Sequence, residues 1–317
     1  MTFLQQLKNE HIGYVSAIIA AILFGSVSTI TKPVLADLNA LSVSSLTYII
    51  AGLSLIPFLK FSSNSNNATL ESTNPSNKRK WKNNRKSYFL LLLTSICGAV
   101  IAPSLFFYGL SNTSAWDSSI LINGEVLFSI LLAVVFFNEK LIKREIVAIV
   151  LVLVGIVILT TKMQFFSSSS LNSFLELNIG NILIVGSTLF WALDNNISKI
   201  LSKTIHIPKI IVLKTLIGGS ILFILFIIIF GIHDLNATIT IFHIPYLVFA
   251  GSLGFGASLF FFLHSLKRIG TIKTILLFSA SSIFGMIFAK VLLNENITIY
   301  QIIAVGVILF GCYLIKR

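Results

Sequence analysis

The stretch Trp191-Ala192-Leu193-Asp194-Asn195-Asn196-Ile197-Ser198-Lys199 places one acidic residue and two amides near the end of an apolar run that begins at about Gly180. The next apolar run carries a lysine, Lys214. An ion inside a membrane-length apolar helix costs about 2.5–3.5 kcal/mol on insertion scales, so it usually has a partner or a functional role. The stretch therefore indicates a membrane helix whose charge must be explained by the rest of the chain.

The composition excludes a water-soluble globular domain. The chain has 317 residues, of which 56% are hydrophobic and 11% are charged, whereas an ordinary soluble domain is about 25% charged. Nearly the whole length divides into apolar runs of about 20 residues, the length that crosses a ~30 Å hydrocarbon core as a helix. We expect an all-α, polytopic membrane protein. The first run begins only at Ile12 and many others follow it, so it is expected to be a span and not a cleaved signal peptide.

The distribution of charge and the positions of the cysteines and histidines limit which classes of partner and cofactor we expect. The formal net charge is +12, but the lysines and arginines lie between the apolar runs, which is a feature of membrane topology and not of nucleic-acid binding. Cys97 and Cys312 both fall in predicted spans, so no disulfide framework is indicated. The histidines show no metal-ligand spacing. We therefore expect no nucleic acid, metal or cofactor.

The apolar runs predict ten spans, at residues 12–31, 41–60, 88–110, 116–137, 145–162, 178–198, 209–231, 244–266, 271–293 and 297–315. If the N-terminus is cytoplasmic, the basic residues fall in the inner segments and the outer loops hold only Lys32 and Lys162. Since inner loops of membrane proteins carry the excess of Lys and Arg, both termini are predicted to be cytoplasmic. The plasma membrane is the expected location.

An internal repeat divides the chain into residues 1–162 and 178–317, with a linker at 163–177. Residues 62–87 are rich in Ser and Asn and then basic, so they are expected to form a disordered cytoplasmic loop, either as a plain linker or with a regulatory role. The sequence Val135-Phe136-Phe137-Asn138-Glu139 in the first half matches Val291-Leu292-Leu293-Asn294-Glu295 in the second. Because five spans per half is an odd number, the halves should be inverted repeats, which is a transporter architecture.

These residues resemble a known family. The fourth span reads Ile122-Asn123-Gly124-Glu125-Val126-Leu127-Phe128 and closes on Asn138-Glu139, which is similar to the EamA-like repeat of the drug/metabolite transporter superfamily. That repeat typically has Glu-Pro where this chain has Glu125-Val126; the second half departs from the pattern with Ser281-Ser282. The Trp191 to Asn196 stretch with Lys214 resembles one bacterial and archaeal subgroup. The resemblance implies a ten-helix transporter and implies no particular solute.

Asp194 and Lys214 are the first candidate site residues. On consecutive antiparallel spans they are expected at similar depth, where they can form an ion pair. The pair could fix helix packing, or it could open when a solute or proton arrives. Alternatively, Lys214 could extend to the cytoplasmic interface without meeting Asp194. Trp191 lies one turn before Asp194, and Asn195 follows it, so both join the candidate set.

Glu125 and Ser282 complete the candidate set. Glu125 lies near the middle of span four with no lysine evident at its depth, so it is most easily kept protonated. It could carry a coupled proton, or it could be a neutral carboxyl bonded to a neighbouring helix. Ser282 and nearby hydroxyls in span nine could line a cavity or serve helix packing. Glu139 and Glu295, at helix ends, are expected to anchor tight turns.

The sequence favours a secondary transporter over its rivals. We expect an exporter of small organic metabolites such as amino acids, working by alternating access, with protons as an open choice of coupling ion and a homodimer as an open choice of assembly. The alternatives are a channel, a non-transporting membrane sensor or a membrane-embedded enzyme. The sequence has no H-E-x-x-H or G-x-S-x-G motif and no Walker-type phosphate loop, so we expect neither an enzyme nor an ATP-driven pump.

Overall fold

The computed structural model describes residues 3–66, 85–137, 143–161, 178–201, 205, 207–231, 239–269, 274 and 277–314, and within these ranges every regular element is a helix and none is a strand. An α-helix satisfies its own backbone hydrogen bonds, which lipid cannot do. Five helical stretches are long and apolar enough to cross a membrane: Glu10–Asp37, Ala40–Pro57, Arg85–Ser111, Pro208–Phe230 and His243–Phe262. The expectation of an all-α membrane protein is confirmed, and the count of ten spans stays a prediction.

The helices follow the predicted apolar runs. In the first half they are α1 (Phe3–Asp37), α2 (Ala40–Asn66), α4 (Arg85–Ile96), η1 (Cys97–Ile101), α5 (Ala102–Ser111), α6 (Ala115–Leu121), α7 (Gly124–Phe137) and α8 (Lys143–Thr161). In the second half they are α9 (Ile179–Leu201), α10 (Ile207–Phe230), α12 (His243–Val248), η4 (Phe249–Ala257), α13 (Ser258–Ile269), α15 (Ser281–Leu293) and α16 (Ile299–Leu314).

The structure shortens the loop that was expected at 62–87. Helix α2 continues to Asn66 and α4 begins at Arg85, so both ends of that segment are helical. Hydropathy marks where a span leaves the apolar layer, whereas a helix can continue beyond it into water. Residues 67–84 and the predicted linker at 163–177 lie outside the described residues.

The fourth predicted span is two helices and not one. Helix α6 ends at Leu121 and α7 begins at Gly124, and residues 122–123 form a turn between them. There the backbone N–H of Asn123 donates to the carbonyl of Ile120 at 3.1 Å, a tighter bond than the α-helical pattern. Asn and Gly are weak helix formers. Hydropathy averaged over a span does not detect this break, because the residues on both sides of Asn123-Gly124-Glu125 are apolar.

The third long helix of each half contains a π-helical turn. In the first half η1 separates α4 from α5, and in the second η4 separates α12 from α13. A π-helical turn widens the helix locally and often marks a functional position. Gly98 lies in η1 and Gly254 in η4, and both receive a side chain from another helix.

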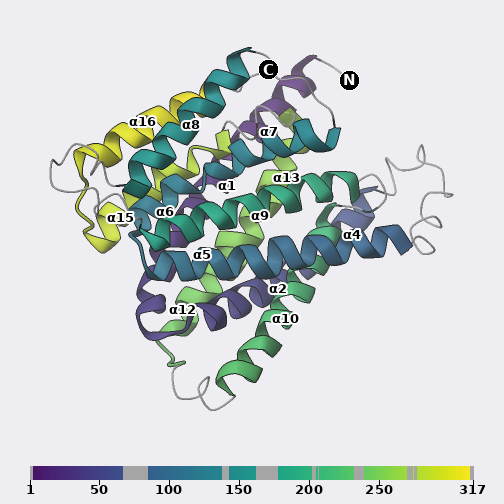
Figure 1. The fold of residues 1–317 in the computed structure, drawn as a ribbon. Helices are drawn as coiled ribbons and strands as arrows, with labels where there is room; N and C mark the ends of the chain where they lie inside the picture. The colour runs from purple at the N-terminus through teal and green to yellow at the C-terminus, as the bar shows by residue number, and fades with distance from the viewer. Residues whose placement is uncertain are drawn as a thin grey trace.

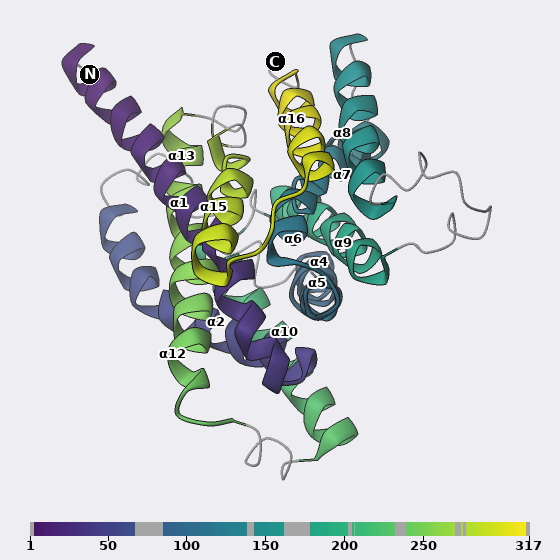
Figure 2. The same ribbon diagram turned by 90° about the vertical axis from the view of Figure 1, so that its left-hand side faces the viewer.

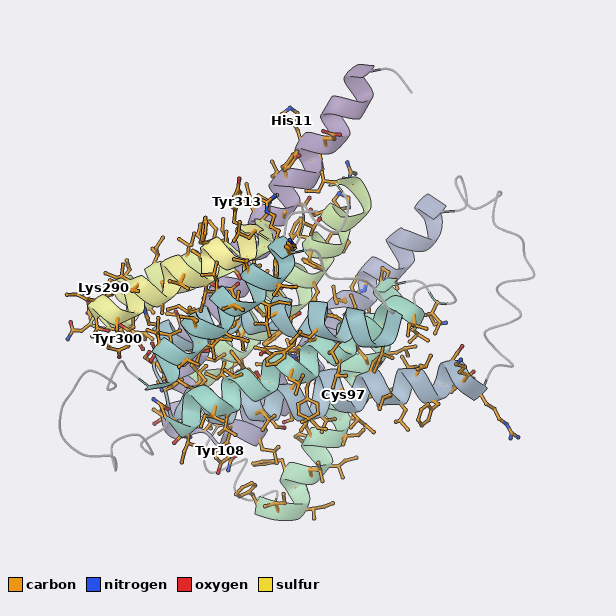
Figure 3. The ribbon with its side chains drawn as sticks, turned by 45° about the horizontal axis from the view of Figure 1, so that its top comes forward. His11, Cys97, Tyr108, Lys290, Tyr300 and Tyr313 are labelled. Atoms are coloured by element: carbon orange, nitrogen blue, oxygen red, sulfur yellow. The ribbon has the colours of Figure 1, made fainter. Side chains whose placement is uncertain are left out.

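Polar contacts gather one set of helix ends on what we call the distal side, where α1 ends and α16 begins. His243 Nε2 lies 3.0 Å from Asp37 Oδ2, which joins the start of α12 to the end of α1. Asn181 Nδ2 donates to the carbonyl of Leu159 at 3.1 Å, which joins α9 to α8. The start of α1 and the end of α16 both lie on the opposite, terminal side (Figures 1 and 2). Figure 3 likewise shows Lys290 and Tyr300 together, well away from His11.

The helices pack in pairs drawn from the two halves of the chain. Helix α2 packs along α10, and α8 packs along α16, as Figures 1 and 2 show for the second pair. Helix α1 packs against α13 and α15, whereas α9 packs against α5 and α7. The first helix of each half therefore contacts the third and fourth helical stretches of the other half. This arrangement brings Asp194 on α9 into the centre of the bundle.

Candidate functional site

The predicted ion pair between Asp194 and Lys214 forms. The Nζ atom of Lys214 donates to Oδ2 of Asp194, and the two residues are only 8% and 3% exposed. The hydroxyl of Ser198, one turn further along α9, donates to Oδ1 of Asp194 at 3.0 Å. Both oxygens of the Asp194 carboxylate therefore have a donor. A buried charge is tolerated when it is paired and hydrogen-bonded in this way.

Gly98 provides the space for Asp194. A β-carbon at Gly98 would overlap Oδ2 of the Asp194 carboxylate, so η1 forms a wall against which this side chain rests. The next residue, Ala99, packs against Gly218 on α10, one turn beyond Lys214, and a β-carbon at Gly218 would overlap Ala99. Both helices that supply the ion pair thus press onto the same π-helical turn. Sequence reasoning missed Gly98 because nothing local distinguishes it from other apolar-run glycines.

Glu125 lies beside the ion pair. The side-chain amide of Asn195 donates to Oε1 of Glu125, which joins α9 to the start of α7. Glu125 is within electrostatic range of both Asp194 and Lys214. No lysine at the depth of Glu125 is evident from sequence, because the helix packing that brings Lys214 into its neighbourhood is not visible there. We call Glu125, Asp194, Asn195 and Lys214 the charged cluster.

An aromatic cluster lies next to the charged cluster, one helical turn closer to the distal side. Trp191 Nε1 donates to the hydroxyl of Tyr48 at 3.2 Å, and the Trp191 ring lies 5.2 Å from that of Phe106. Phe255 contacts Tyr48 at 5.1 Å and Phe24 at 5.9 Å between ring centres. These rings come from α1, α2, α5, α9 and η4. Trp191 therefore joins both clusters, and the other four rings were not foreseen from sequence.

Ser282 lies at a different place from the charged cluster. Its hydroxyl accepts a hydrogen bond of 2.5 Å from the side-chain amide of Asn123, in the break between α6 and α7. Ser282 is 1% exposed and lies in the first turn of α15. The predicted residues thus divide into the charged cluster with Trp191 and a separate contact at the break. The two are linked because Glu125 follows Asn123 by two residues.

Glu295 makes contacts at two turns: its backbone N–H donates to the carbonyl of Ala289 at 3.4 Å, and its side chain reaches the start of α6. Its Oε1 accepts from the backbone N–H of Ala115 and its Oε2 from that of Trp116, each at 2.9 Å, so it caps α6. Glu139, for which the same role in a turn was expected, lies outside the described residues. Within the described ranges no group of three His, Cys, Asp or Glu residues is placed to hold a metal ion.

Comparison with known proteins agrees with this arrangement. The model of the EamA-like transporter family matches residues 11–161 and again residues 178–317. The chain belongs to the EamA-like transporter family. It is also 33% identical over 303 residues to a protein of Methanothermobacter thermautotrophicus described as an uncharacterized transporter, covering 96% of this chain and 85% of that one. The family and this relative indicate an integral membrane transporter that handles a small-molecule solute.

A solved structure shares the fold of this transporter. It is a crystal structure described only as that of a protein, and it aligns with a TM-score of 0.63 at 14% identity. The alignment covers 96% of each chain. At this identity the likeness concerns the fold alone.

The ion pair predicts a strong dependence on both partners. Asp194→Asn and Lys214→Gln should each lower the melting temperature and the membrane abundance, because removing one partner of a buried pair costs about 3–5 kcal/mol. A charge-swapped variant, Asp194→Lys with Lys214→Asp, should recover part of the loss. Thermal unfolding in detergent measures the effect, with the exposed Glu10→Gln as the control. Wild-type stability of both single variants would contradict the pairing.

The contact at Gly98 predicts a coupled effect. Gly98→Ala should destabilise the protein, since overpacking typically costs about 1–3 kcal/mol. The loss should be smaller in an Asp194→Ala background, which removes the overlapping carboxylate and keeps only the β-carbon of residue 194, at 2.6 Å. Gly186→Ala is a matched control, because its β-carbon would meet only Leu105, at 3.6 Å. Melting temperatures of the single and double variants give the coupling energy, and strictly additive losses would rule out the contact.

Proposed function

We propose that this EamA-like transporter is a secondary carrier that exports small organic metabolites such as amino acids by alternating access, with protons as the coupling ion. In this proposal the chain crosses the plasma membrane ten times as two inverted repeats, with both termini cytoplasmic. The distal side is then the outer side. Because one chain supplies every member of the charged cluster, the carrier can work as a monomer or as a homodimer of two complete units.

The packing pattern supports the inverted repeats. Exchanging the two halves converts the contact of α1 with α13 into that of α9 with α5, and the contact of α1 with α15 into that of α9 with α7. The contacts of α2 with α10 and of α8 with α16 convert into themselves. A twofold relation between repeats generates this kind of pattern.

The irregular positions of the helices give a second, independent support. The register that aligns Glu139 with Glu295 also aligns Gly98 with Gly254, and these two glycines lie in η1 and η4. The same register places the break at Asn123 opposite Ser279, which lies in the turn before α15. Discontinuous helices at matching positions of two repeats are typical of transporter binding sites.

The observation that carries the proposal is the charged cluster itself. It holds two carboxyl groups, Glu125 and Asp194, against one ammonium group, Lys214. Asp194 balances Lys214, so an ionised Glu125 leaves an excess negative charge in a low-dielectric region, where a proton or the ammonium group of a solute can neutralise it. The ammonium group of an amino acid suits the carboxylate of Glu125, because opposite charges that meet in a site are complementary.

A flux assay tests whether the protein is a carrier. Candidate solutes are first screened by thermal shift and by metabolite export from cells that express the protein. For a solute that binds, we expect saturable flux in proteoliposomes and counterflow of labelled solute against an unlabelled pool. Flux that never saturates and lacks counterflow would indicate a channel. Binding without any flux would indicate a sensor.

Proton coupling predicts a selective effect at Glu125. Glu125→Gln removes the exchangeable proton but keeps the size of the side chain and its acceptor oxygen for Asn195. We expect this variant to lose flux driven by a pH gradient and to keep solute–solute exchange. Glu10→Gln, which alters an exposed carboxyl near the N-terminus, serves as the control. An unchanged response to the pH gradient in Glu125→Gln would exclude Glu125 as the proton carrier.

A further inference from the structure

The corner between α5 and α6, residues 110–116, is held by a lysine from the first helix. Lys32 Nζ donates to the carbonyls of Leu110 at 2.6 Å, Ser111 at 3.2 Å and Thr113 at 2.5 Å. These carbonyls lie at the C-terminal end of α5, where a helix leaves its last acceptors unpaired and carries partial negative charge. An ammonium group at this position satisfies the carbonyls and complements the helix dipole.

A glutamate from the other half of the chain holds the opposite side of the same corner. Helix α15 ends at Leu293, and its C-cap residue Asn294 adopts the left-handed conformation with φ of 53°. This conformation directs the next residue, Glu295, away from the helix axis and towards the N-terminus of α6. There its two oxygens accept from the N–H groups of Ala115 and Trp116. A carboxylate at a helix N-terminus is stabilised by the unpaired donors and the helix dipole.

A third contact joins α6 to α16. Gln301 Nε2 donates to Oδ1 of Asp117, in the first turn of α6, at 2.7 Å. Both residues are buried, with 5% and 4% exposure. The start of α6 is therefore held by α1, by the end of α15 and by α16, and every one of these contacts lies on the distal side.

Helix α6 is a short segment between this corner and the break. It has seven residues, from Ala115 to Leu121, and the turn at 122–123 separates it from α7. All seven residues are buried. The helix contacts the other half through Ser119, which lies against Gly285 of α15, and contacts α1 through Ser118, whose hydroxyl lies 3.2 Å from that of Ser28. Beyond the break, the first turn of α7 carries Glu125. A rigid movement of α6 about the break would thus reach the charged cluster directly.

We propose that α6 is the gate on the distal side of the transport path, that Lys32 and Glu295 lock it closed, and that the break at residues 122–123 is its hinge. The gate couples opening to the state of Glu125 because the hinge immediately precedes that residue. The inference rests on the proposed alternating access. It assigns the conformation described here to the state in which the distal side is closed.

A cysteine reporter tests the gate. Ser118 is fully buried behind the corner, and Ser118→Cys in a Cys97→Ser, Cys312→Ser background leaves one thiol in the chain. A membrane-impermeant thiol reagent is added to the distal side of reconstituted protein. With the lock intact, labelling should be slow. Glu295→Gln replaces one acceptor oxygen with an amide donor that faces an N–H group, and Lys32→Met removes the ammonium group.

Each lock variant should label at least about tenfold faster, since losing a hydrogen bond to a charged group shifts a two-state equilibrium by that factor or more. Lys290→Met is the matched control for Lys32→Met, because Lys290 also lies near the distal end of its helix and is exposed (Figure 3). Labelling at the intact rate in both lock variants, at wild-type membrane abundance, would overturn the proposal. Equal acceleration by Lys290→Met would also overturn it, as a sign of general loosening.

Two further measurements keep the result decisive. If Glu295→Gln lowers membrane abundance, Glu295→Asp keeps both acceptor oxygens on a shorter stem and should show a smaller acceleration. Flux measured on the same variants distinguishes a failure of the proposed gate from a failure of the proposed carrier. Counterflow with no change in labelling would refute the gate and leave the carrier intact, whereas accelerated labelling without flux of any solute would refute the carrier and leave the movement of α6 intact.

Discussion

The buried ion pair between Asp194 and Lys214 is the interaction on which the centre of this transporter depends. Each charge alone is costly in an apolar helix, so the pair requires α9 and α10 to lie at matching depth. Both oxygens of Asp194 are occupied, one by Lys214 and one by Ser198. The pair also needs Gly98, because only a turn without a side chain lets the carboxylate approach η1. The pairing of these two charges thus constrains how α9, α10 and η1 lie relative to one another.

The ion pair determines what Glu125 can do. Since Asp194 already neutralises Lys214, the side-chain hydrogen bond that Glu125 receives among the described residues comes from the amide of Asn195. The charge state of Glu125 is therefore sensitive to whatever enters the cluster. The break at residues 122–123 then gives this sensitivity a mechanical path, because Asn123 is bonded to Ser282 of the other half and precedes Glu125 by two residues. Helix α6 and Glu125, whose charge responds to the cluster, therefore lie on the same short segment of the chain.

The sequence predicted the features that depend on local pattern. It did not predict the contacts between residues that are far apart in the chain. The apolar runs predicted the helices, and antiparallel neighbours predicted the meeting of Asp194 and Lys214. The contact of Glu125 with Asn195 joins residues 70 positions apart, and Glu295 caps a helix 180 positions earlier. Nothing in either local sequence marks these partners. The Asn-Glu pair at 294–295 did give a partial signal, because Asn tolerates the left-handed conformation that redirects Glu295.

The two halves resemble each other in backbone and differ in charge at matching positions. The π-helical turn at Gly98 receives Asp194, whereas the turn at Gly254 receives Val27. Aligning the first span of each half, Leu23-Phe24 with Leu189-Phe190, sets Ser28 opposite Asp194. Ser28 is uncharged, and its hydroxyl lies against that of Ser118 on α6. The same position therefore holds an ion-pair partner in the second half and a residue that contacts the proposed gate helix in the first half. A repeat architecture gains a single polar centre in this way, because two equivalent buried ion pairs would double the desolvation cost without adding a second path.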